Sequence, residues 1–399
     1  MVILTDKILY RNFRLIDGTG KIPVEDAYFI VENKKIVKVG KIEDLKNSDK
    51  VKEVDLSGKT VMPGLINSHV HITMEPVGDP VSIMLKESDA KTALRGTANL
   101  KKHLLSGTTF FRDLGASNGI DFDLRDAVNE GLIEGSQFVT SGRCLTMTGG
   151  HGWFIGREAD GVDELRKAAR EQLKAGADLI KIMATGGVMT KGVEPGSPQL
   201  SMEEMEAAII EAHKAGKKTA THAQGTQGIK NAVLAGIDSV EHGIFLDDEV
   251  IELMVSKGVY LVPTLVAPYF IVKNGVEAGI PKFAVDKSNY VMKYHWESFR
   301  KAYKAGVKIA MGTDAGTPFN LHDGAPHELK LMVECGMSPM DAIVASTKSS
   351  ADLLGVLDDY GTLEEGKHAD FLILNENPLD NLDTLFNLDS VYKLGKKVR

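Results

Sequence analysis

The middle of the chain alternates helix-like segments with short apolar runs, and a glycine separates the two at regular places. Such a glycine stands at positions Gly107, Gly176, Gly216, Gly236, Gly258 and Gly306. A glycine just past a helix end supplies the left-handed residue that closes the helix. The repeated order of helix, glycine and apolar run predicts parallel strands that are connected by helices.

Two of the helix-like segments carry signals for where they begin. Ser201 and Glu204 have the spacing of a capping box, which predicts a helix that runs to Ala215. Asp163 is predicted to cap the helix that ends at Ala175.

The apolar runs predict a closed barrel. They end near His71, Asp113, Ser141, Ala184, His222, His242, Thr264 and Asp314. Repeated eight times, a strand followed by a helix closes into a (β/α)8 barrel of the TIM type, and active sites of such barrels lie at the C-terminal ends of the strands. We therefore predict an α/β fold in which residues 61–354 form the catalytic barrel.

The two ends of the chain have a different pattern. Residues 1–60 hold short alternating runs separated by turns, and the runs Phe371–Leu374 and Ser390–Lys393 are strand-like again. We therefore predict a small β-sandwich domain that is built from residues 1–60 and 355–399, with the barrel inserted between its halves.

Composition narrows the class of protein. The 399 residues are 43% hydrophobic and 26% charged, which is typical of a globular enzyme. A formal net charge of −8 argues against binding to nucleic acid or to an anionic membrane. Cys144 and Cys335 lie in apolar segments and are expected to be reduced. With no signal-peptide pattern and no membrane-spanning run, we expect a cytoplasmic protein.

The first candidate for chemistry is the pair His69 and His71, at the end of an apolar run. Residues two apart on a strand project from the same face, so both imidazoles can reach one metal ion. The alternative is a pair of core histidines that are hydrogen-bonded to the backbone.

Four further polar residues stand in or at the end of apolar runs. They are Lys181, His222, His242 and Asp314. Together with the first pair they give the order His-x-His, Lys, His, His, Asp at the predicted C-terminal ends of barrel strands, with Lys181 slightly inside its strand. This order predicts one shared site.

The ordered set resembles the binuclear-metal subtype of the amidohydrolase superfamily, and the resemblance covers nearly the whole chain. It includes the entry to the barrel at residues 62–71 and the return segment at residues 361–374. Residues 148–152, 181–190, 240–243 and 263–264 are most similar to the branch of Xaa-Pro dipeptidases, Xaa-Arg/Lys carboxypeptidases and imidazolonepropionase relatives.

The resemblance implies two divalent metal ions. His69, His71 and Asp314 would bind the more buried ion, and His222 and His242 would bind the second. Lys181, carboxylated by CO2, would bridge the two ions, because a free ammonium has no lone pair with which to bind a cation. Imidazole and oxygen donors suit Zn2+, although other divalent ions compete. The alternative for Lys181 is a lysine that forms a salt bridge or extends its amine to solvent.

The resemblance also implies a reaction and a class of substrate. A hydroxide that bridges the metals would attack an amide carbonyl, and Asp314 would act as general base and then protonate the leaving amine. The favoured substrates are dipeptides or N-acyl amino acids. His151 and Gln224 are predicted to contact them; the alternatives are a structural bond for His151 and exposure to solvent for Gln224. Relatives often assemble, so we expect a homo-oligomer.

Three other functions stay open at this point. A cyclic amidase would open an imidazolone or hydantoin-like ring, and a further hydrolase would act on an amide-bearing toxin or xenobiotic. A non-catalytic barrel that serves as a scaffold is the alternative from another class. A requirement for a free substrate carboxylate would distinguish a peptidase from these.

Some polar residues are expected to lie outside the site. Glu241 is predicted to point to the face of its strand opposite His242. His103 is predicted to face outward or sideways from a helix. The segment from residue 266 to about residue 290 is long for a connection between a strand and a helix, and it is predicted to form a lid.

Overall fold

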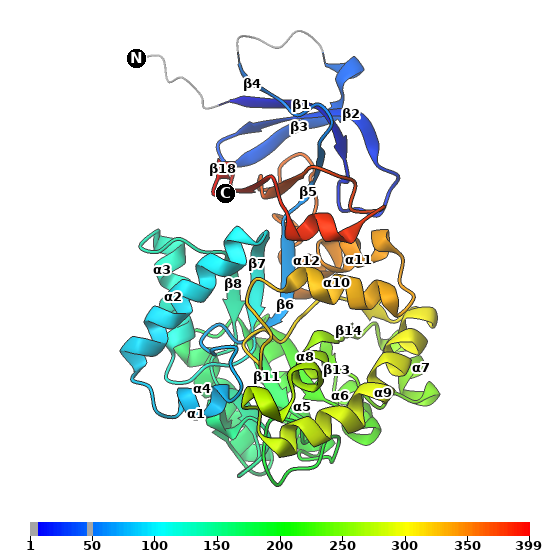
Figure 1. Ribbon diagram of the computed structural model, residues 1–399. Helices are drawn as coiled ribbons and strands as arrows, with labels where there is room; N and C mark the ends of the chain where they lie inside the picture. The colour runs from blue at the N-terminus through cyan, green and yellow to red at the C-terminus, as the bar shows by residue number, and fades with distance from the viewer. Residues whose placement is uncertain (1–6, 46–50) are drawn as a thin grey trace.

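A computed structural model describes residues 7–45 and 51–399, and Figure 1 shows two parts. The larger part is a ring of parallel strands surrounded by helices. The smaller part is a β-sheet that lies at one end of the ring and contains segments from both ends of the chain.

The ring is formed by two hydrogen-bonded sheets. The first has the order β6-β7-β8, and the second has the order β10-β9-β11-β12-β13-β14-β15. Their strands are β6 (Leu65–Val70), β7 (Thr108–Asp113), β8 (Gln137–Thr140), β9 (Cys144–Thr146), β10 (Gly156–Glu158), β11 (Leu179–Met183), β12 (Lys218–Ala223), β13 (Ser239–His242), β14 (Tyr260–Val262) and β15 (Lys308–Ile309).

Backbone hydrogen bonds join the two sheets at both edges. The amide of Ser68 donates to the carbonyl of Met311 over 2.8 Å, and the amide of Asp178 donates to the carbonyl of Thr140 over 2.8 Å. The strands therefore close into a barrel of the TIM type, as the spacing of the apolar runs predicts.

Helices cover the outside of the barrel (Figure 1). They are α1 (Pro80–Met84), α2 (Asp89–Leu105), α3 (Ile120–Glu130), α4 (Val162–Ala175), α5 (Met202–Lys214), α6 (Thr226–Leu234), α7 (Asp248–Lys257), α8 (Val266–Asn274), α9 (Lys282–Lys304), α10 (Ala325–Glu334), α11 (Pro339–Ala345) and α12 (Lys348–Leu354).

Most of the predicted helix ends are confirmed. The glycines expected to close helices all have positive φ angles, between 67° at Gly258 and 104° at Gly176. The capping box of Ser201 and Glu204 opens α5. The prediction for α4 is wrong, because Gly161 is its N-cap and Asp163 lies within its first turn.

The segment after β14 is a pair of helices and not an extended loop. Helix α8 follows the strand, a short 3-10 turn (Val276–Ala278) links the two, and α9 then returns toward β15. The residues predicted to form a lid therefore lie in a helical hairpin, in which α8 packs against α9. The hairpin lies at the C-terminal side of the barrel strands.

The smaller sheet has eight strands in the order β18-β17-β16-β5-β1-β2-β3, with β4 paired to β1. They are β1 (Ile8–Leu15), β2 (Val24–Glu32), β3 (Lys35–Lys41), β4 (Lys52–Asp55), β5 (Thr60–Pro63), β16 (Phe371–Leu374), β17 (Ser390–Lys393) and β18 (Lys396–Lys397). The sheet thus joins both ends of the chain, while its arrangement as a sandwich stays a prediction.

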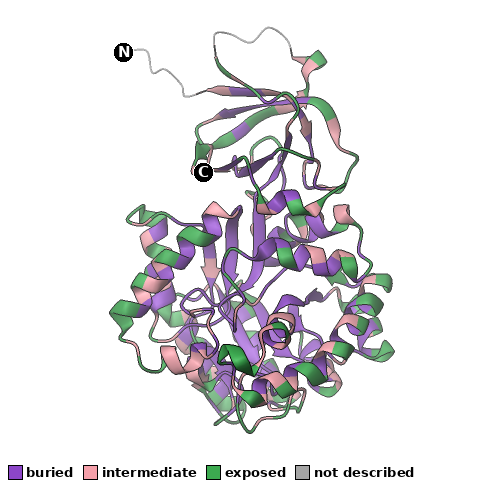
Figure 2. Cartoon of the chain, in the orientation of Figure 1, coloured by how far each residue is buried: buried purple, intermediate pink, exposed green. Residues whose placement is uncertain are grey.

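The interior of the barrel is buried and continuous with the face of the small sheet that touches it (Figure 2). Leu372 and Leu388 belong to the same apolar cluster as Leu145 and Ile180 of the barrel. The small sheet and the barrel therefore share one apolar cluster. Among the helices of residues 7–45 and 51–399, none has the length and hydropathy of a transmembrane segment.

Candidate metal centre

The polar residues predicted from the sequence converge on one cavity at the C-terminal ends of the barrel strands. Its lining includes His69, His71, Lys181, His222, His242 and Asp314, and also His151 and Gln224. The cavity has a volume of about 740 Å³, its open mouth included.

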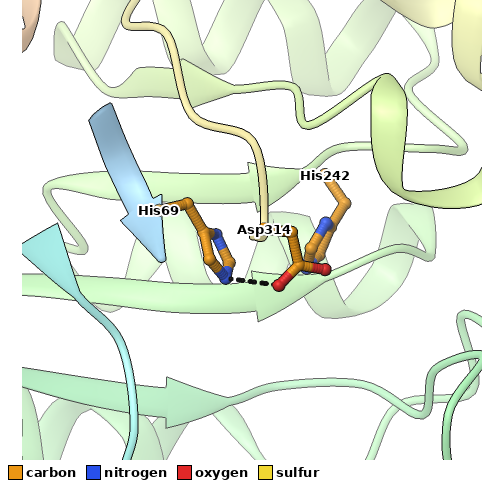
Figure 3. Close-up of side chains that lie close together, drawn as sticks. All are labelled: His69, His242 and Asp314. Carbon is orange, nitrogen blue, oxygen red and sulfur yellow. Dashed lines mark ion pairs between the residues drawn. The ribbon is translucent and has the colours of Figure 1, made fainter. Parts of the chain in front are cut away.

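One close group within the cavity joins β6, β13 and the segment that follows β15. Ligand atoms of His69, His242 and Asp314 all lie within 4.8 Å of one another (Figure 3). Oδ1 of Asp314 lies 3.3 Å from Nε2 of His69 and 3.2 Å from Nε2 of His71. The carboxylate therefore faces both histidines of the His-x-His pair.

Left-handed backbone turns direct the strand ends into the cavity. His242, Thr264 and Asp314 have φ angles of 74°, 52° and 62°. Such conformations are uncommon for residues other than glycine, and they cluster at functional sites because the surrounding structure must hold them. At or after the ends of β13, β14 and β15, these conformations turn side chains toward the cavity. The regular alternation of a strand would direct the same side chains away from it.

The histidines are oriented through their Nδ1 atoms. Nδ1 of His69 lies 2.9 Å from Oε2 of Glu241, and Nδ1 of His71 lies 3.2 Å from the carbonyl oxygen of Gly115. Nδ1 of His242 lies 2.7 Å from Oγ1 of Thr264. The carboxylate and carbonyl acceptors fix His69 and His71 in the tautomer that leaves the Nε2 lone pair free, as metal-binding histidines require. The hydroxyl of Thr264 can donate to His242 or accept from it, and His222 is contacted through Nε2, which lies 3.4 Å from the carbonyl oxygen of Gly186.

Glu241 contradicts the prediction that it faces away from His242. It is fully buried inside the barrel, where Oε1 accepts a hydrogen bond of 2.8 Å from Nη2 of Arg112 and Oε2 accepts one from His69. The left-handed backbone at His242 explains why the prediction fails, because it lets the neighbouring side chains of Glu241 and His242 both point into the barrel. Burial opposes ionisation, yet Arg112 and His69 lower the pKa of Glu241 to about 2.

Lys181 lies between these groups without a partner. Its side chain is 1% exposed, and Nζ has no hydrogen-bond partner among the described residues. Burial lowers the pKa of its ammonium to about 8. A neutral amine is the form that can add CO2, so the surroundings of Lys181 are compatible with a carbamate.

The charges of the site are held in a defined state. Although burial opposes it, His69 and His71 lower the pKa of Asp314 well below its usual range, so this carboxyl is ionised. Burial lowers the pKa values of His222 and His242 far enough to keep both imidazoles neutral. Although burial opposes it, the hydrogen bond and charge of Asp314 raise the pKa of His71. Neutral imidazoles and an anionic carboxylate are the forms that bind a divalent cation, so the donor set fits such ions once His71 has released its proton.

His151 and Gln224 lie in the cavity beside this group. The ring centroids of His151 and His222 are 4.2 Å apart, and Nδ1 of His151 lies 3.0 Å from Oγ1 of Thr190. Burial lowers the pKa of His151 to about 3, so it is a neutral hydrogen-bonding group. A Cβ atom at Gly187 would lie 2.6 Å from Nε2 of His151, which explains the glycine there.

Sequence reasoning missed the residues that orient the histidines. Arg112, Thr190 and Thr264 were not predicted to orient histidines or Glu241, because each acts on a residue distant in sequence. The prediction for His103 is wrong. It is fully buried, and its Nε2 lies 3.1 Å from Nδ1 of His322, which in turn binds the carbonyl of Met74 at the cavity wall.

Comparison with known proteins shows the family to which the chain belongs. Residues 60–398 match the model of the amidohydrolase family. The ochratoxinase of Aspergillus niger is 33% identical over 94% of this chain and 82% of that protein. Its crystal structure matches with a TM-score of 0.88 and 30% identity, covering 99% of this chain and 96% of that one.

Solved peptidases are similar as well. A Xaa-Pro dipeptidase with methionine bound in its active site has a TM-score of 0.91 and 34% identity, covering 98% of this chain and all of that one (100%). A protein from Bifidobacterium longum that is assigned as a prolidase has a TM-score of 0.86 and 32% identity, covering 98% of this chain and 94% of that one. Enzymes of this family generally use divalent metals. The chain therefore belongs to the amidohydrolase family, and it is a hydrolase that acts on amide bonds.

Proposed function

We propose that the protein is a binuclear metal-dependent peptidase that hydrolyses dipeptides or N-acyl amino acids. The observation that carries the proposal is the convergence of the histidines, Asp314 and a buried, unpartnered Lys181 on one cavity. His69, His71 and Asp314 would hold one ion, and His222 and His242 the other. When bound, such ions, which we expect to be zinc, polarise a substrate carbonyl and raise the acidity of water.

Lys181 is proposed to bridge the two ions as a carbamate. Its Nζ is buried among metal-binding side chains and has no acceptor in the described part of the chain. An ammonium ion left in that position would be a buried charge without a partner, which is costly. Addition of CO2 to the neutral amine releases one proton and gives a carbamate anion with two oxygen donors, whose buried charge the metal ions would compensate.

Asp314 is proposed to move the proton during hydrolysis. Its carboxylate faces the interior of the cavity from the end of a strand, and it is ionised. It would accept the proton of the attacking water as the carbon–oxygen bond forms. It would then give that proton to the amide nitrogen as the carbon–nitrogen bond breaks. Glu241 contributes by holding His69, and does not contact the substrate.

His151 and Gln224 are proposed to bind the substrate. Both line the cavity; the Oε1 atom of Gln224 is buried and has no partner among the described residues, while Thr190 orients His151. A neutral imidazole and an amide can donate hydrogen bonds to a carboxylate or accept one from an amide. The relative that holds methionine in its active site supports an amino-acid product for this scaffold.

The test combines metal content with activity. We expect about two zinc ions per chain, release of amino acids from a library of dipeptides and N-acyl amino acids, and an inactive Lys181→Ala variant. Lys174→Ala is the matched control, because Lys174 is exposed on the outer helix α4. One metal or none, together with an active Lys181→Ala variant, would contradict the bridging carbamate.

The substrate class has its own test. Amidation of the C-terminus should abolish hydrolysis of otherwise good dipeptide substrates, because the free carboxylate is recognised. Two bound metals without any turnover of free-carboxylate substrates would keep the metal site and reject the peptidase.

The similarity to an ochratoxinase favours a second candidate, namely hydrolysis of an amide-bearing toxin. Incubation with ochratoxin and analysis of the products distinguishes the two. Faster hydrolysis of ochratoxin than of any dipeptide would favour the second candidate.

A further inference from the structure

Much of the cavity lining outside the metal-binding group is apolar, and we call this part the apolar wall. It comprises Met74, Phe154, Met183, Met189, Ile271 and Val291. These side chains come from several elements, since Met183 ends β11, Ile271 belongs to α8 and Val291 belongs to α9. The helical hairpin α8–α9 therefore contributes one side of the wall, and the connection after β11 contributes the other.

The same wall lacks a counter-ion for a basic group. Among the described residues that line the cavity, Asp314 is the only carboxylate, and it is already engaged with His69 and His71. A lysine or arginine side chain of a substrate would lie buried against methyl and thioether groups without an anionic partner. Burial of an unpaired charge is strongly unfavourable.

The nearest additional cation is also unavailable to a substrate. Lys287, on α9, directs its Nζ toward the carbonyl oxygens of Gly187, Thr190 and Val193, and it donates to Thr190 over 2.8 Å. Among the described residues that line the cavity, Lys181 is the only lysine or arginine, and it is assigned to the metal-binding group. An acidic substrate side chain against the apolar residues would therefore meet no cation that is free to pair with it.

Two uncharged polar groups interrupt the apolar wall. Oγ of Ser288 and Oε1 of Gln224 are buried and have no hydrogen-bond partner among the described residues, and both residues line the cavity. Buried polar atoms without partners are rare, and at a cavity wall they are available to a ligand. Oε1 of Gln224 can accept a hydrogen bond from a substrate amide, and the hydroxyl of Ser288 can donate one to a substrate carboxylate. These substrate groups are the same whatever the substrate side chain.

We propose that this cavity selects amide substrates with a bulky, uncharged, apolar side chain, such as leucine, methionine or phenylalanine, and rejects lysine and arginine. The inference rests on the proposed peptidase function and specifies its substrate class. Ser288 and Gln224 recognise the constant polar part of the substrate, and the apolar wall recognises the variable part. Of the activities in the branch that the sequence resembles, carboxypeptidase action on arginine or lysine is thereby excluded for this chain.

The first test uses two panels of free-carboxylate substrates with the zinc-loaded enzyme. One panel varies the residue on the amine side of the scissile bond, and the other varies the residue on the acyl side. In at least one panel we expect kcat/KM for leucine, methionine or phenylalanine to exceed that for lysine or arginine by about 10- to 200-fold or more. Equal or faster turnover of the basic residues in both panels overturns the inference.

The second test changes the wall itself. Met189 is only half-buried, so Met189→Glu places a carboxylate on the wall where water can reach it. We expect the preference to shift at least tenfold toward lysine and arginine. The matched control Met189→Gln has the same size without the charge, and it should weaken the apolar preference without creating a basic one. An unchanged preference in Met189→Glu contradicts the assignment of the wall.

Binding separates failure of the inference from failure of the proposed function. Titration calorimetry with free leucine, methionine, lysine and arginine compares side chains at constant α-amino and α-carboxyl groups and requires no turnover. Tighter binding of the apolar amino acids supports the inference even if no dipeptide is cleaved, a result that would reject the peptidase alone. Tighter binding of lysine or arginine overturns the inference even if dipeptides are cleaved.

Discussion

Asp314 combines a strained backbone with two close histidines. Its φ angle of 62° lies in the left-handed region, where Asp and Asn are the best tolerated residues after glycine. Because Oδ1 contacts Nε2 of His69 and of His71, the carboxylate is held in place from two sides. The backbone conformation and the chemistry of this position therefore restrict it to the same small set of residues.

Substitution of Asp314 by asparagine should separate metal binding from proton transfer. Asparagine keeps the shape and tolerates the left-handed backbone, so Asp314→Asn should fold and retain most of its metal. It cannot accept a proton, so kcat should fall by about 10²- to 10⁴-fold, the usual contribution of general acid–base catalysis. Metal analysis and steady-state kinetics on the same preparation check this. Full activity would reject Asp314 as the proton carrier.

Glu241 and Arg112 form a buried ion pair that also orients a histidine. The side chain of Arg112 is 1% exposed and that of Glu241 is fully buried, and Arg112 also donates to the carbonyl of Ser68 over 2.6 Å. Removal of one member of such a pair leaves the other charge without compensation, which costs about 3–5 kcal/mol.

Glu241→Gln should therefore lower the free energy of unfolding of the metal-free protein by about 3–5 kcal/mol. Urea unfolding measured by circular dichroism checks the value. Glu53→Gln is the matched control, because Glu53 pairs with Arg11 at the surface, where loss of an ion pair costs about 0–1 kcal/mol. Equal effects of the two substitutions would mean that the buried pair contributes no more than a surface pair.

The convergence of these residues on one cavity could be predicted from the sequence, and the residues that orient them could not. His69, His222 and Asp314 end apolar runs and so are visible as polar residues at strand ends. Glu241 was assigned to the wrong side, because alternation along a strand assumes regular φ angles and His242 departs from them. Arg112 is also invisible to local patterns, since its partner Glu241 lies in a different strand.

At the scale of elements, the rhythm of helix, glycine and strand was sufficient to predict the barrel. Each closing glycine adopts the positive φ that the prediction requires. The hairpin of α8 and α9 was harder, because its first helix is short and mostly apolar and has no side-chain cap. Its function as a cavity wall follows from packing against the connection after β11, which no local pattern encodes.

Lys287 fastens α9 to that connection. Its Nζ donates to three backbone carbonyls in residues 187–193, and Oγ1 of Thr190 in the same segment accepts a bond from His151 or donates one to it over 3.0 Å. Gly187, in the same segment, lies close against the ring of His151. The position of the segment therefore determines the position of this imidazole. Lys287 is therefore a positioning residue that acts through Thr190.

Lys287→Met should loosen the segment while leaving the barrel folded. Lys191 is exposed within the segment, so trypsin cleavage after Lys191 should become about tenfold faster or more, since hydrogen bonds to a charged group are each worth about 1.5–3 kcal/mol. The KM for free-carboxylate substrates should rise as His151 loses its orientation. Lys282→Met is the control, because Lys282 lies on the same helix and pairs only with exposed Asp286. Unchanged cleavage at Lys191 would show that the segment is held by other contacts.

At the scale of the whole molecule, the small sheet and the barrel share structure at their junction. Only Gly64 separates β5 of the sheet from β6 of the barrel, and its amide donates to the carbonyl of Asp370 over 3.0 Å. On β16, the side chain of Leu372 packs into the barrel cluster, whereas Ile373 belongs to the separate core of the sheet. The two apolar cores therefore lie on opposite faces of the same strand, β16.

This sharing predicts that the sheet and the barrel unfold together. Ile373→Ala removes a buried side chain from the core of the sheet and should cost about 2–5 kcal/mol. Both tryptophans, Trp153 and Trp296, lie in the barrel, so tryptophan fluorescence reports the unfolding of the barrel alone. If the parts are one cooperative unit, Ile373→Ala lowers the urea midpoint of this signal as much as Leu372→Ala does, since each substitution destabilises the same folded state. A midpoint that moves only for Leu372→Ala would mean that the barrel stays folded after the core of the sheet has opened, and that the metal site does not depend on the far face of the sheet.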